Sequence, residues 1–344
     1  MIHLSRSRRS QALRRFFGSE TMLADSFGRR IDYLRLSVTD RCDLRCAYCM
    51  PPEYKNYDDP EHWLTIEELA RVARLFVELG VHRVRLTGGE PLVRARIDNL
   101  AYLLGRIQGL EDLSLSTNGT RLAQWAPALK SAGVKRLNVS LDTLSRERFA
   151  QITHRDVLHD VLCGLDAARA EGFDLVKINM VWLPEINGDE LDAMIDYCRG
   201  NGFVLRLIEN MPMGDAARSL GSSSLQSVIA DLRIRHGLVD RVIPGGGPAR
   251  YLASADGRFS IGFITPISQH FCESCNRVRV SVTGTLHLCL GQEDRLELLP
   301  MLRQGCGDAE IGNAIKLAIM QKPWKHEFQE LPQKIVRIMA STGG

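Results

Sequence analysis

Three cysteines that lie close together, Cys42, Cys46 and Cys49, have the spacing C-x3-C-x2-C. This short spacing predicts that three thiolates share one tight loop and hold a single metal centre. A structural zinc site needs four nitrogen or sulfur ligands, and an ordinary four-iron cluster needs four cysteines. The nearest histidines, His62 and His82, are far along the chain. The loop therefore indicates a four-iron cluster with one iron free for an outside ligand, and a zinc site completed by a distant histidine is the alternative.

A second group of cysteines, Cys272, Cys275 and Cys289, has the spacing C-x2-C-x13-C. Cys289 follows a predicted hairpin, which would return it to the C-x2-C loop. Cys306 follows 17 residues later and could complete a zinc ribbon, which is the structural alternative. Residues 276–279, with the sequence Asn-Arg-Val-Arg, place two cations beside this metal centre. A purely structural zinc site has no use for these cations, so the second group also indicates a functional metal centre.

The remaining cysteines and the N-terminal segment indicate where in the cell the protein is located. Cys163 and Cys198 fall within predicted helices and are interpreted as core residues. Six of the nine cysteines lie in the two groups, and the odd total argues against a disulfide framework, which predicts a cytoplasmic protein. Residues 1–21 contain five arginines and one acid. We interpret them as a disordered basic tail, with Met22 a plausible alternative start. A transit peptide, and hence a mitochondrial protein, is the alternative.

Composition and charge favour neither a nucleic-acid partner nor a membrane. Hydrophobic residues make up 44% of the 344 residues and charged residues 25%, which is ordinary for a globular protein. The net charge of +3 is too small to indicate nucleic acid by itself. No run of 18 apolar residues is present, so the sequence predicts no membrane span.

Short apolar strands alternate with amphipathic helices from Ile31 onward. The clearest helix can be capped by Thr65 with Glu68 three residues later, and Gly80 ends it. Six such units predict a parallel α/β architecture, an open, partial (β/α)6 TIM-type barrel. A Rossmann sheet is the alternative, but no G-x-G-x-x-G follows the first strand. The predicted strands are 33–38, 83–87, 113–116, 136–140, 175–181 and 203–208, and the predicted helices are 65–79, 95–107, 121–132, 158–171 and 188–200.

The pattern changes after about residue 240. Residues 244–248, Pro-Gly-Gly-Gly-Pro, predict a linker or turn. Beyond them, 258–264 and 278–290 are predicted strands, the second broken by a turn at Thr283 and Gly284, and a helix is expected near 308–320. The sequence thus predicts a partial barrel over 22–243 and a C-terminal α+β region over 244–344 that packs on it and carries the second metal centre.

A polar segment follows each predicted strand. In (β/α) barrels the active site lies at the C-terminal ends of the strands. Single Asn-Gly or Gly-Gly pairs are common in turns, but six polar segments on one face indicate a functional site. The segments are 39–41, 87–91, 116–119, 140–142, 177–179 and 209–211.

The first cysteine loop, with Tyr48 before its last cysteine, resembles the radical S-adenosylmethionine (SAM) superfamily. This resemblance implies that the open iron of a [4Fe-4S] cluster binds the amino and carboxylate groups of SAM. It also implies one-electron cleavage of SAM to methionine and a 5′-deoxyadenosyl radical.

The two cysteine groups together resemble the family of GTP 3′,8-cyclases, over essentially all of residues 22–344. This resemblance implies two [4Fe-4S] clusters, SAM, and conversion of GTP to (8S)-3′,8-cyclo-7,8-dihydroguanosine 5′-triphosphate, the first step of molybdenum cofactor biosynthesis. It further implies a homodimer that passes its product to cyclic pyranopterin monophosphate synthase. The matching motifs are 34–42 (LRLSVTDRC), 85–91 (RLTGGEP), 138–142 (NVSLD), 272–279 (CESCNRVR) and the terminal Gly343-Gly344.

The same resemblance implies roles for individual residues. The catalytic residues would be Arg277, Arg279, Gly343 and Gly344. Ser116, one of the residues implied to hold GTP, departs from the family pattern, which usually has threonine at this position. Arginine forks match phosphate oxygens bidentately, so cations from several strand ends suit a triphosphate. The residues implied to line SAM are Tyr48, Gly89, Ser140 and Met211, and those implied to hold GTP are Arg35, Arg85, Ser116, Lys177, Arg206, Arg277 and Arg279.

Two other functions remain open from the sequence. Radical SAM enzymes that mature peptides also carry extra C-terminal clusters, but these usually contain more cysteines. A zinc-stabilised nucleic-acid-binding module with a basic tail is a non-enzymatic alternative. Analysis of bound iron and acid-labile sulfide distinguishes a GTP 3′,8-cyclase from the zinc module. Measurement of GTP binding distinguishes it from a peptide-maturing enzyme.

Overall fold

The computed structural model describes residues 22–243, 246–328 and 337–343 of the chain. Within these residues a twelve-stranded sheet has the order β12-β11-β10-β1-β2-β3-β4-β5-β6-β9-β8-β7. From β10 to β9 every neighbouring pair is parallel. The outer strands are not paired with each other, so the sheet is open, as predicted. The core strands are β1 Tyr33–Ser37, β2 Arg83–Thr87, β3 Asp112–Thr117, β4 Arg136–Ser140, β5 Leu175–Trp182 and β6 Val204–Glu209.

Strands from the last third of the chain extend both edges of this sheet. β9 pairs in parallel with β6, and β10 pairs in parallel with β1. The predicted C-terminal region therefore continues the sheet of the barrel and does not form a separate layer. The division at residues 243 and 244 remains a prediction, and residues 1–21 lie outside the described residues. The remaining strands are β7 Val239–Arg241, β8 Arg250–Ala253, β9 Ser260–Ile264, β10 Arg277–Val280, β11 Thr285–His287 and β12 Arg295–Glu297.

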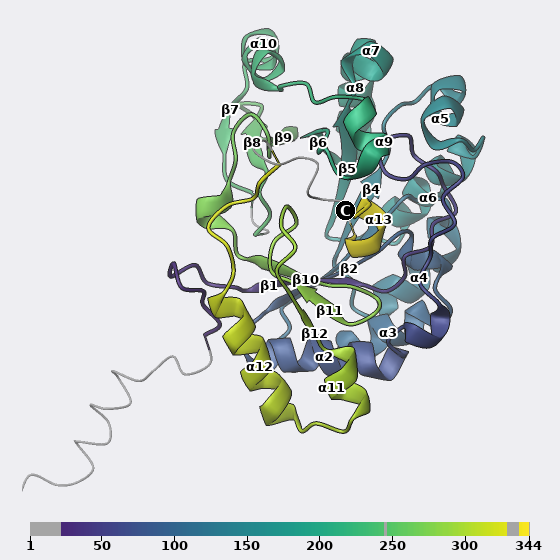
Figure 1. Cartoon of the computed structure of the whole chain (residues 1–344). Helices are drawn as coiled ribbons and strands as arrows, with labels where there is room; N and C mark the ends of the chain where they lie inside the picture. The colour runs from purple at the N-terminus through teal and green to yellow at the C-terminus, as the bar shows by residue number, and fades with distance from the viewer. Residues whose placement is uncertain (1–21, 244–245, 329–336, 344) are drawn as a thin grey trace, which may run out of the picture.

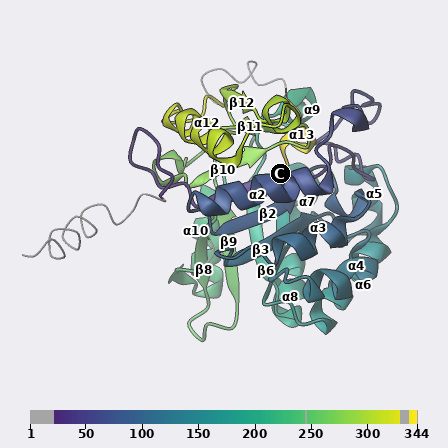
Figure 2. The same ribbon diagram turned by 90° about the horizontal axis from the view of Figure 1, so that it is seen from below.

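Helices surround the strands in an arc (Figures 1 and 2). The capping box predicted at Thr65 and Glu68 is present, and Thr65 Oγ accepts from the Glu68 N–H at 3.1 Å. The sequence did not predict six of the described α-helices, which are α5, α7, α9, α10, α11 and α13. The helices are α2 Ile66–Glu78, α3 Ile97–Leu104, α4 Leu122–Ser131, α5 Arg146–Thr153, α6 Leu158–Ala170, α7 Pro184–Asn187, α8 Leu191–Asn201, α9 Gly214–Ser219, α10 Gln226–His236, α11 Leu299–Arg303, α12 Asp308–Met320 and α13 Met339–Thr342.

Successive side chains of each strand point to opposite faces of the sheet, so one set packs against the helices and the other faces the interior of the barrel. On β1, Leu34 and Leu36 are fully buried in the main hydrophobic core, whereas Tyr33 and Arg35 line an interior cavity. Because the parallel strands are in register, polar residues at equivalent positions become neighbours across the sheet. None of the described helices is long and apolar enough to cross a membrane.

Candidate active site between two cysteine groups

The first cysteine group follows β1, at the C-terminal ends of the parallel strands. Burial raises the pKa of Cys42 to about 12 and that of Cys49 to about 11. Burial and the charge of neighbouring Cys49 hold the pKa of Cys46 well above its usual range. Iron binds the deprotonated thiolate, so cluster binding would release the protons that these thiols carry. The three thiols thus lie close enough to influence one another, as ligands of one cluster must.

Hydrogen-bond donors already point at these sulfur atoms. The Leu44 N–H donates to Cys42 Sγ at 3.4 Å, and Asn118 Nδ2 does so at 3.7 Å. The backbone of Ala340 lies within hydrogen-bonding reach of Cys49. Donors to sulfur stabilise thiolates and set the reduction potential of a cluster. The donor set therefore fits a [4Fe-4S] cluster.

Of the residues implied to line SAM, Tyr48 and Gly89 lie in or against this loop, whereas Met211 lines the cavity at the second cysteine group. Tyr48 Oη donates to Asp142 Oδ2 at 2.7 Å, and burial raises the pKa of Asp142 to about 6. A Cβ on Gly89 would lie 2.3 Å from the carbonyl oxygen of Arg41, so only glycine allows this loop to pack against the segment before the cysteines. Ser140 ends β4, two residues before Asp142. Asp142 lies in the predicted polar segment 140–142, but its hydrogen bond with Tyr48 was not predicted.

The second cysteine group lies at the opposite end of β1 and β10. Cys275 is two residues before Arg277, and Tyr33 pairs with Arg277. Five strand residues span roughly 16 Å, which separates the two loops. Although burial acts to raise it, the positive charges of Arg277 and Lys322 lower the pKa of Cys275 to about 7. The loops therefore face the barrel from both ends.

Backbone donors also surround the second group. The N–H groups of His326 and Gly291 lie within reach of Cys272 and Cys289, respectively. All three sulfur-bearing residues line one cavity. Among the described residues, no three Cys, His, Asp or Glu side chains converge as ligands of a single ion do. A four-iron cluster binds each thiolate to a different iron, so it needs no such convergence, and the residues fit it better than zinc.

The other cysteines lie away from both groups. Cys306 contacts Arg71 through its carbonyl, at 2.8 Å, and does not line the cavity, which argues against the alternative of a zinc ribbon. Cys198 is fully buried in the core, as predicted. The prediction for Cys163 was wrong, because its side chain is exposed on α6 beside His159.

A cavity extends from the second cysteine group through the barrel interior. Its walls include five buried arginines that we call the arginine belt, and among the described residues none that lines it is Asp or Glu. The belt consists of Arg35, Arg85, Arg206, Arg277 and Arg279.

Strand register places most of the belt side by side. Arg35 lies between Arg85 on β2 and Arg279 on β10. Like charges placed opposite each other in a sheet destabilise it unless something neutralises them. Burial, and then Arg279 and Arg85, hold the pKa of Arg35 well below its usual range. The site therefore favours an anion.

Several donors in the belt have no partner. The Nε atoms of Arg35, Arg277 and Arg279 are buried without a hydrogen bond within the described residues. The Tyr33 hydroxyl is also buried and unpaired there. An orphaned buried donor costs about 1–3 kcal/mol, so four of them in one cavity indicate a ligand rich in acceptors.

Lys177 and Arg206 occupy the β5 and β6 side of the barrel. Lys177 Nζ donates to Tyr251 Oη at 3.0 Å. Arg206 Nε donates to Asn179 Oδ1 at 2.8 Å, and burial lowers the pKa of Arg206 to about 10. Lys177 and Ser116 do not line the cavity itself, although Ser116 has a buried, unpaired hydroxyl.

The C-terminal tail lies at the mouth of the barrel, where α13 is drawn in yellow (Figure 1). Met339 packs against Met213 and Phe328, together with the cavity residue Met211. A Cβ on Gly343 would lie 2.2 Å from Thr87 Cγ2. This placement agrees with a tail inserted into the mouth, and Gly344 lies outside the described residues.

Sequence reasoning missed some residues of the cavity. Tyr33 is two residues before Arg35, so strand alternation could have placed it on the same face. His287 also lines the cavity and accepts a hydrogen bond at Nδ1 from Arg337 Nη1 at 2.7 Å. Nothing local in the sequence marks His287, because its neighbours come from β10 and the tail.

Comparison with known proteins identifies the family. The Radical SAM superfamily model matches residues 36–198, and the Molybdenum Cofactor Synthesis C model matches residues 203–328. The GTP 3′,8-cyclase of Ectopseudomonas mendocina is 46% identical over 94% of this chain and 98% of its own length. That of Caulobacter vibrioides is 46% identical over 94% of both chains. The chain belongs to the GTP 3′,8-cyclase family.

Solved structures agree on the fold. Streptococcus suis SuiB bound to its precursor peptide SuiA has a TM-score of 0.59 and covers 96% of this chain and 82% of SuiB. At 15% identity this likeness concerns the fold alone.

Members of the GTP 3′,8-cyclase family are radical SAM enzymes, and the cofactors are two [4Fe-4S] clusters and SAM. Both groups of cysteines in this chain fit that requirement.

Proposed function

We propose that this chain converts GTP to (8S)-3′,8-cyclo-7,8-dihydroguanosine 5′-triphosphate, the first step of molybdenum cofactor biosynthesis. The observation that carries the proposal is the buried arginine belt, with its unpaired donors and without an acid in the cavity. A triphosphate supplies the acceptors and negative charge that these donors lack. The relatives named GTP 3′,8-cyclase support the same conclusion.

Each part of the chain has a distinct role in this proposal. Cys42, Cys46 and Cys49 would hold the [4Fe-4S] cluster, which would supply the electron for cleavage of SAM and so the radical chemistry at C3′ of GTP. Tyr48, Gly89, Ser140 and Met211 line SAM. The arginine belt, with Lys177 and Ser116, binds and orients GTP so that C3′ faces SAM and C8 faces C3′.

The second cysteine group would hold the guanine end of GTP. Cys272, Cys275 and Cys289 line the same cavity as the arginine belt. Arg277 and Arg279, which we propose as catalytic residues, are unpaired at Nε within the described residues and follow Cys275 by two and four positions. Both side chains are buried.

The decisive test is anaerobic incubation of the reconstituted protein with SAM, GTP and dithionite, followed by identification of the product. The cyclised nucleotide is the expected result. Formation of 5′-deoxyadenosine without any change in GTP would contradict the proposal. A peptide substrate, the main alternative, does not need the belt, and a failure of GTP to bind would favour it.

Loss of the second group should separate binding from radical formation. In Cys272→Ala, we expect GTP affinity to fall at least about tenfold, about 1.4 kcal/mol, while uncoupled SAM cleavage continues. Binding titrations and 5′-deoxyadenosine assays measure the two effects. Cys163→Ala is the matched control, since this thiol is exposed on α6. Wild-type GTP affinity in Cys272→Ala would contradict the assignment.

Lys177 should make GTP binding depend on pH. Burial, with Arg206, Arg136 and Arg85 nearby, lowers the pKa of Lys177 from 10.5 to about 6. The unfolded chain thus binds more protons between these values, and stability without ligand rises with pH across that window. A bound triphosphate favours the charged amine, so near pH 8 GTP should bind with uptake of up to about one proton, and more weakly as pH rises.

Calorimetry in buffers with different ionisation heats measures this uptake. Lys177→Met should abolish it, whereas Lys135→Met, at an exposed site just before β4, should not. Equal proton uptake by Lys177→Met and the wild-type protein would show that another group titrates.

Three further features belong to the proposal. We propose a radical SAM barrel over 22–243 and a second-cluster region over 244–344. As the family resemblance implies, we also propose a homodimer in the cytoplasm that passes its product to cyclic pyranopterin monophosphate synthase. Sedimentation of the reconstituted protein and transfer assays with that enzyme test these points.

A further inference from the structure

Arg29 lies just before β1, in a turn closed by the bridge between Ala24 and Arg30. Its side chain is buried, although arginine is rarely buried without a specific partner. The guanidinium donates to Asp25 Oδ2 at 2.6 Å and to the carbonyl of Cys272 at 2.8 Å. It also donates to the carbonyls of Trp324 and Pro323, each at 2.7 Å. One side chain therefore joins three distant parts of the chain.

Asp25 holds this guanidinium in place. Its Oδ1 accepts from the backbone N–H groups of Phe27 and Arg29 at 2.9 and 3.0 Å, and its side chain is fully buried. The rings of Phe27 and Trp324 lie 5.2 and 5.4 Å from the guanidinium carbon. Burying an ion pair is costly unless further hydrogen bonds satisfy both groups. Here they do, so the position of Arg29 is fixed.

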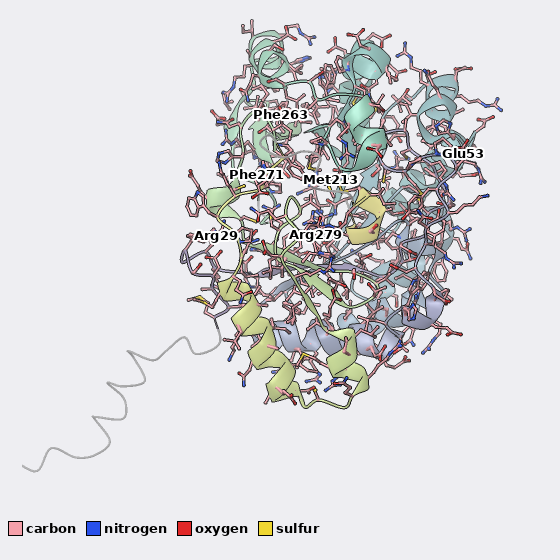
Figure 3. The ribbon with its side chains drawn as sticks, viewed as in Figure 1. Arg29, Glu53, Met213, Phe263, Phe271 and Arg279 are labelled. Atoms are coloured by element: carbon pink, nitrogen blue, oxygen red, sulfur yellow. The ribbon has the colours of Figure 1, made fainter. Side chains whose placement is uncertain are left out.

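The three carbonyls that Arg29 binds all belong to the surroundings of the second cysteine group. Cys272 is one of its sulfur ligands, and Trp324 precedes by two residues His326, whose backbone N–H lies within reach of Cys272 Sγ. Arg29 thus holds both the cysteine and the segment that donates to its sulfur. Figure 3 shows Arg29 at the edge of the molecule below Phe271, which precedes Cys272.

We propose that Arg29 is the positioning residue of the second cysteine group. It fixes the backbone of Cys272 against the segment 323–326, so that the thiolate and its N–H donor meet the cluster together. Its positive charge, beside the carbonyl of Cys272, would also favour the reduced and more negatively charged cluster. The inference rests on the second cluster of the proposed function.

Three variants of the full-length protein test this role. Arg29→Met removes the charge and all four hydrogen bonds, whereas Arg29→Lys keeps the charge and loses the planar fork. Arg30→Met is the matched control, because Arg30 is exposed in the same turn and makes no side-chain hydrogen bond or ion pair within the described residues.

Iron retention is the first measurement. The wild-type protein and Arg30→Met should keep about eight irons per chain, as two four-iron clusters require. In Arg29→Met, iron should be lost to a chelator at least about tenfold faster, towards about four irons. SAM cleavage should remain within about twofold of wild type, because the first cysteine group does not contact Arg29.

The midpoint potential of the second cluster is the second measurement, followed through the electron paramagnetic resonance signal that changes on addition of GTP. Arg29→Met should shift it to more negative values, because a nearby positive charge is lost. Arg29→Lys should retain most of the potential while losing iron faster than wild type. A purely structural residue would not separate these two effects.

Two outcomes would overturn the inference. One is an Arg29→Met protein that keeps eight irons and the wild-type potential. The other is loss of both clusters and of SAM cleavage in Arg29→Met and Arg29→Lys alike, which would make Arg29 a general folding residue. A wild-type protein with only four irons would instead contradict the second cluster of the proposed function.

Discussion

Replacing Cys42 by alanine should reduce SAM cleavage to the background rate. Two thiolates do not retain a four-iron cluster, and without the cluster no electron reaches SAM. The same result is expected for Cys46→Ala and Cys49→Ala. Production of 5′-deoxyadenosine from SAM and dithionite under anaerobic conditions measures the effect.

Cys163→Ala is the control for this prediction as well, since its thiol is exposed on α6 and far from the loop in sequence. It should cleave SAM at the wild-type rate. A normal rate of 5′-deoxyadenosine formation in Cys42→Ala would show that the SAM site has been misplaced.

Replacing Gly343 by alanine should lower the rate of GTP cyclisation at least about tenfold, about 1.4 kcal/mol in transition-state terms. Its φ of 77° is one that glycine adopts freely and other residues rarely do. A Cβ would also lie 2.2 Å from Thr87 Cγ2 and 2.9 Å from the backbone nitrogen of Gly88. The tail would then have to leave the barrel mouth.

Gly307→Ala is the matched control, because no atom lies within 4 Å of a Cβ built there. Thr87→Ser removes the nearest methyl group and should restore part of the rate in Gly343→Ala. Both clusters should survive in every variant, because none of the six cysteines is changed. Full cyclisation by Gly343→Ala would show that the tail is only a frayed end.

Local signals were sufficient to predict the six core strands and the first helix. Thr65 and Glu68 mark a helix start within four residues, and β2 and β4 occur where predicted. α5 could also have been found, because Ser145 caps it by accepting from the Arg148 N–H. α10 carries little signal, since Leu232 is its one buried residue.

The positions of β9 and β10 could not be predicted from local signals. Each pairs with a strand distant in sequence, and nothing in residues 258–290 states which edge it joins. For the same reason only part of the site could be predicted. Arg35, Arg85 and Arg279 were expected to bind one ligand because the resemblance named them, but their side-by-side placement on three neighbouring strands depends on the order of the strands in the sheet.

The contacts that the tail and the N-terminal turn make with the site were the hardest to predict. His287 accepts a hydrogen bond from Arg337, and the carbonyl of Cys272 accepts one from Arg29. In both pairs the contact joins segments separated by tens to hundreds of residues. Amphipathic periodicity and short motifs report only on neighbours in the sequence, so they do not detect such contacts.

The pairing of β1 with β10 has a consequence for how the protein matures. These strands are separated by more than 200 residues, and contacts between such distant segments form late because loop closure is costly. The loop of Cys42, Cys46 and Cys49 lies within the first units to leave the ribosome, whereas the second group needs β10 beside β1 and the turn at Arg29. Iron–sulfur assembly should therefore proceed in order, with the first cluster inserted into a partly made barrel and the second only after the whole chain has folded.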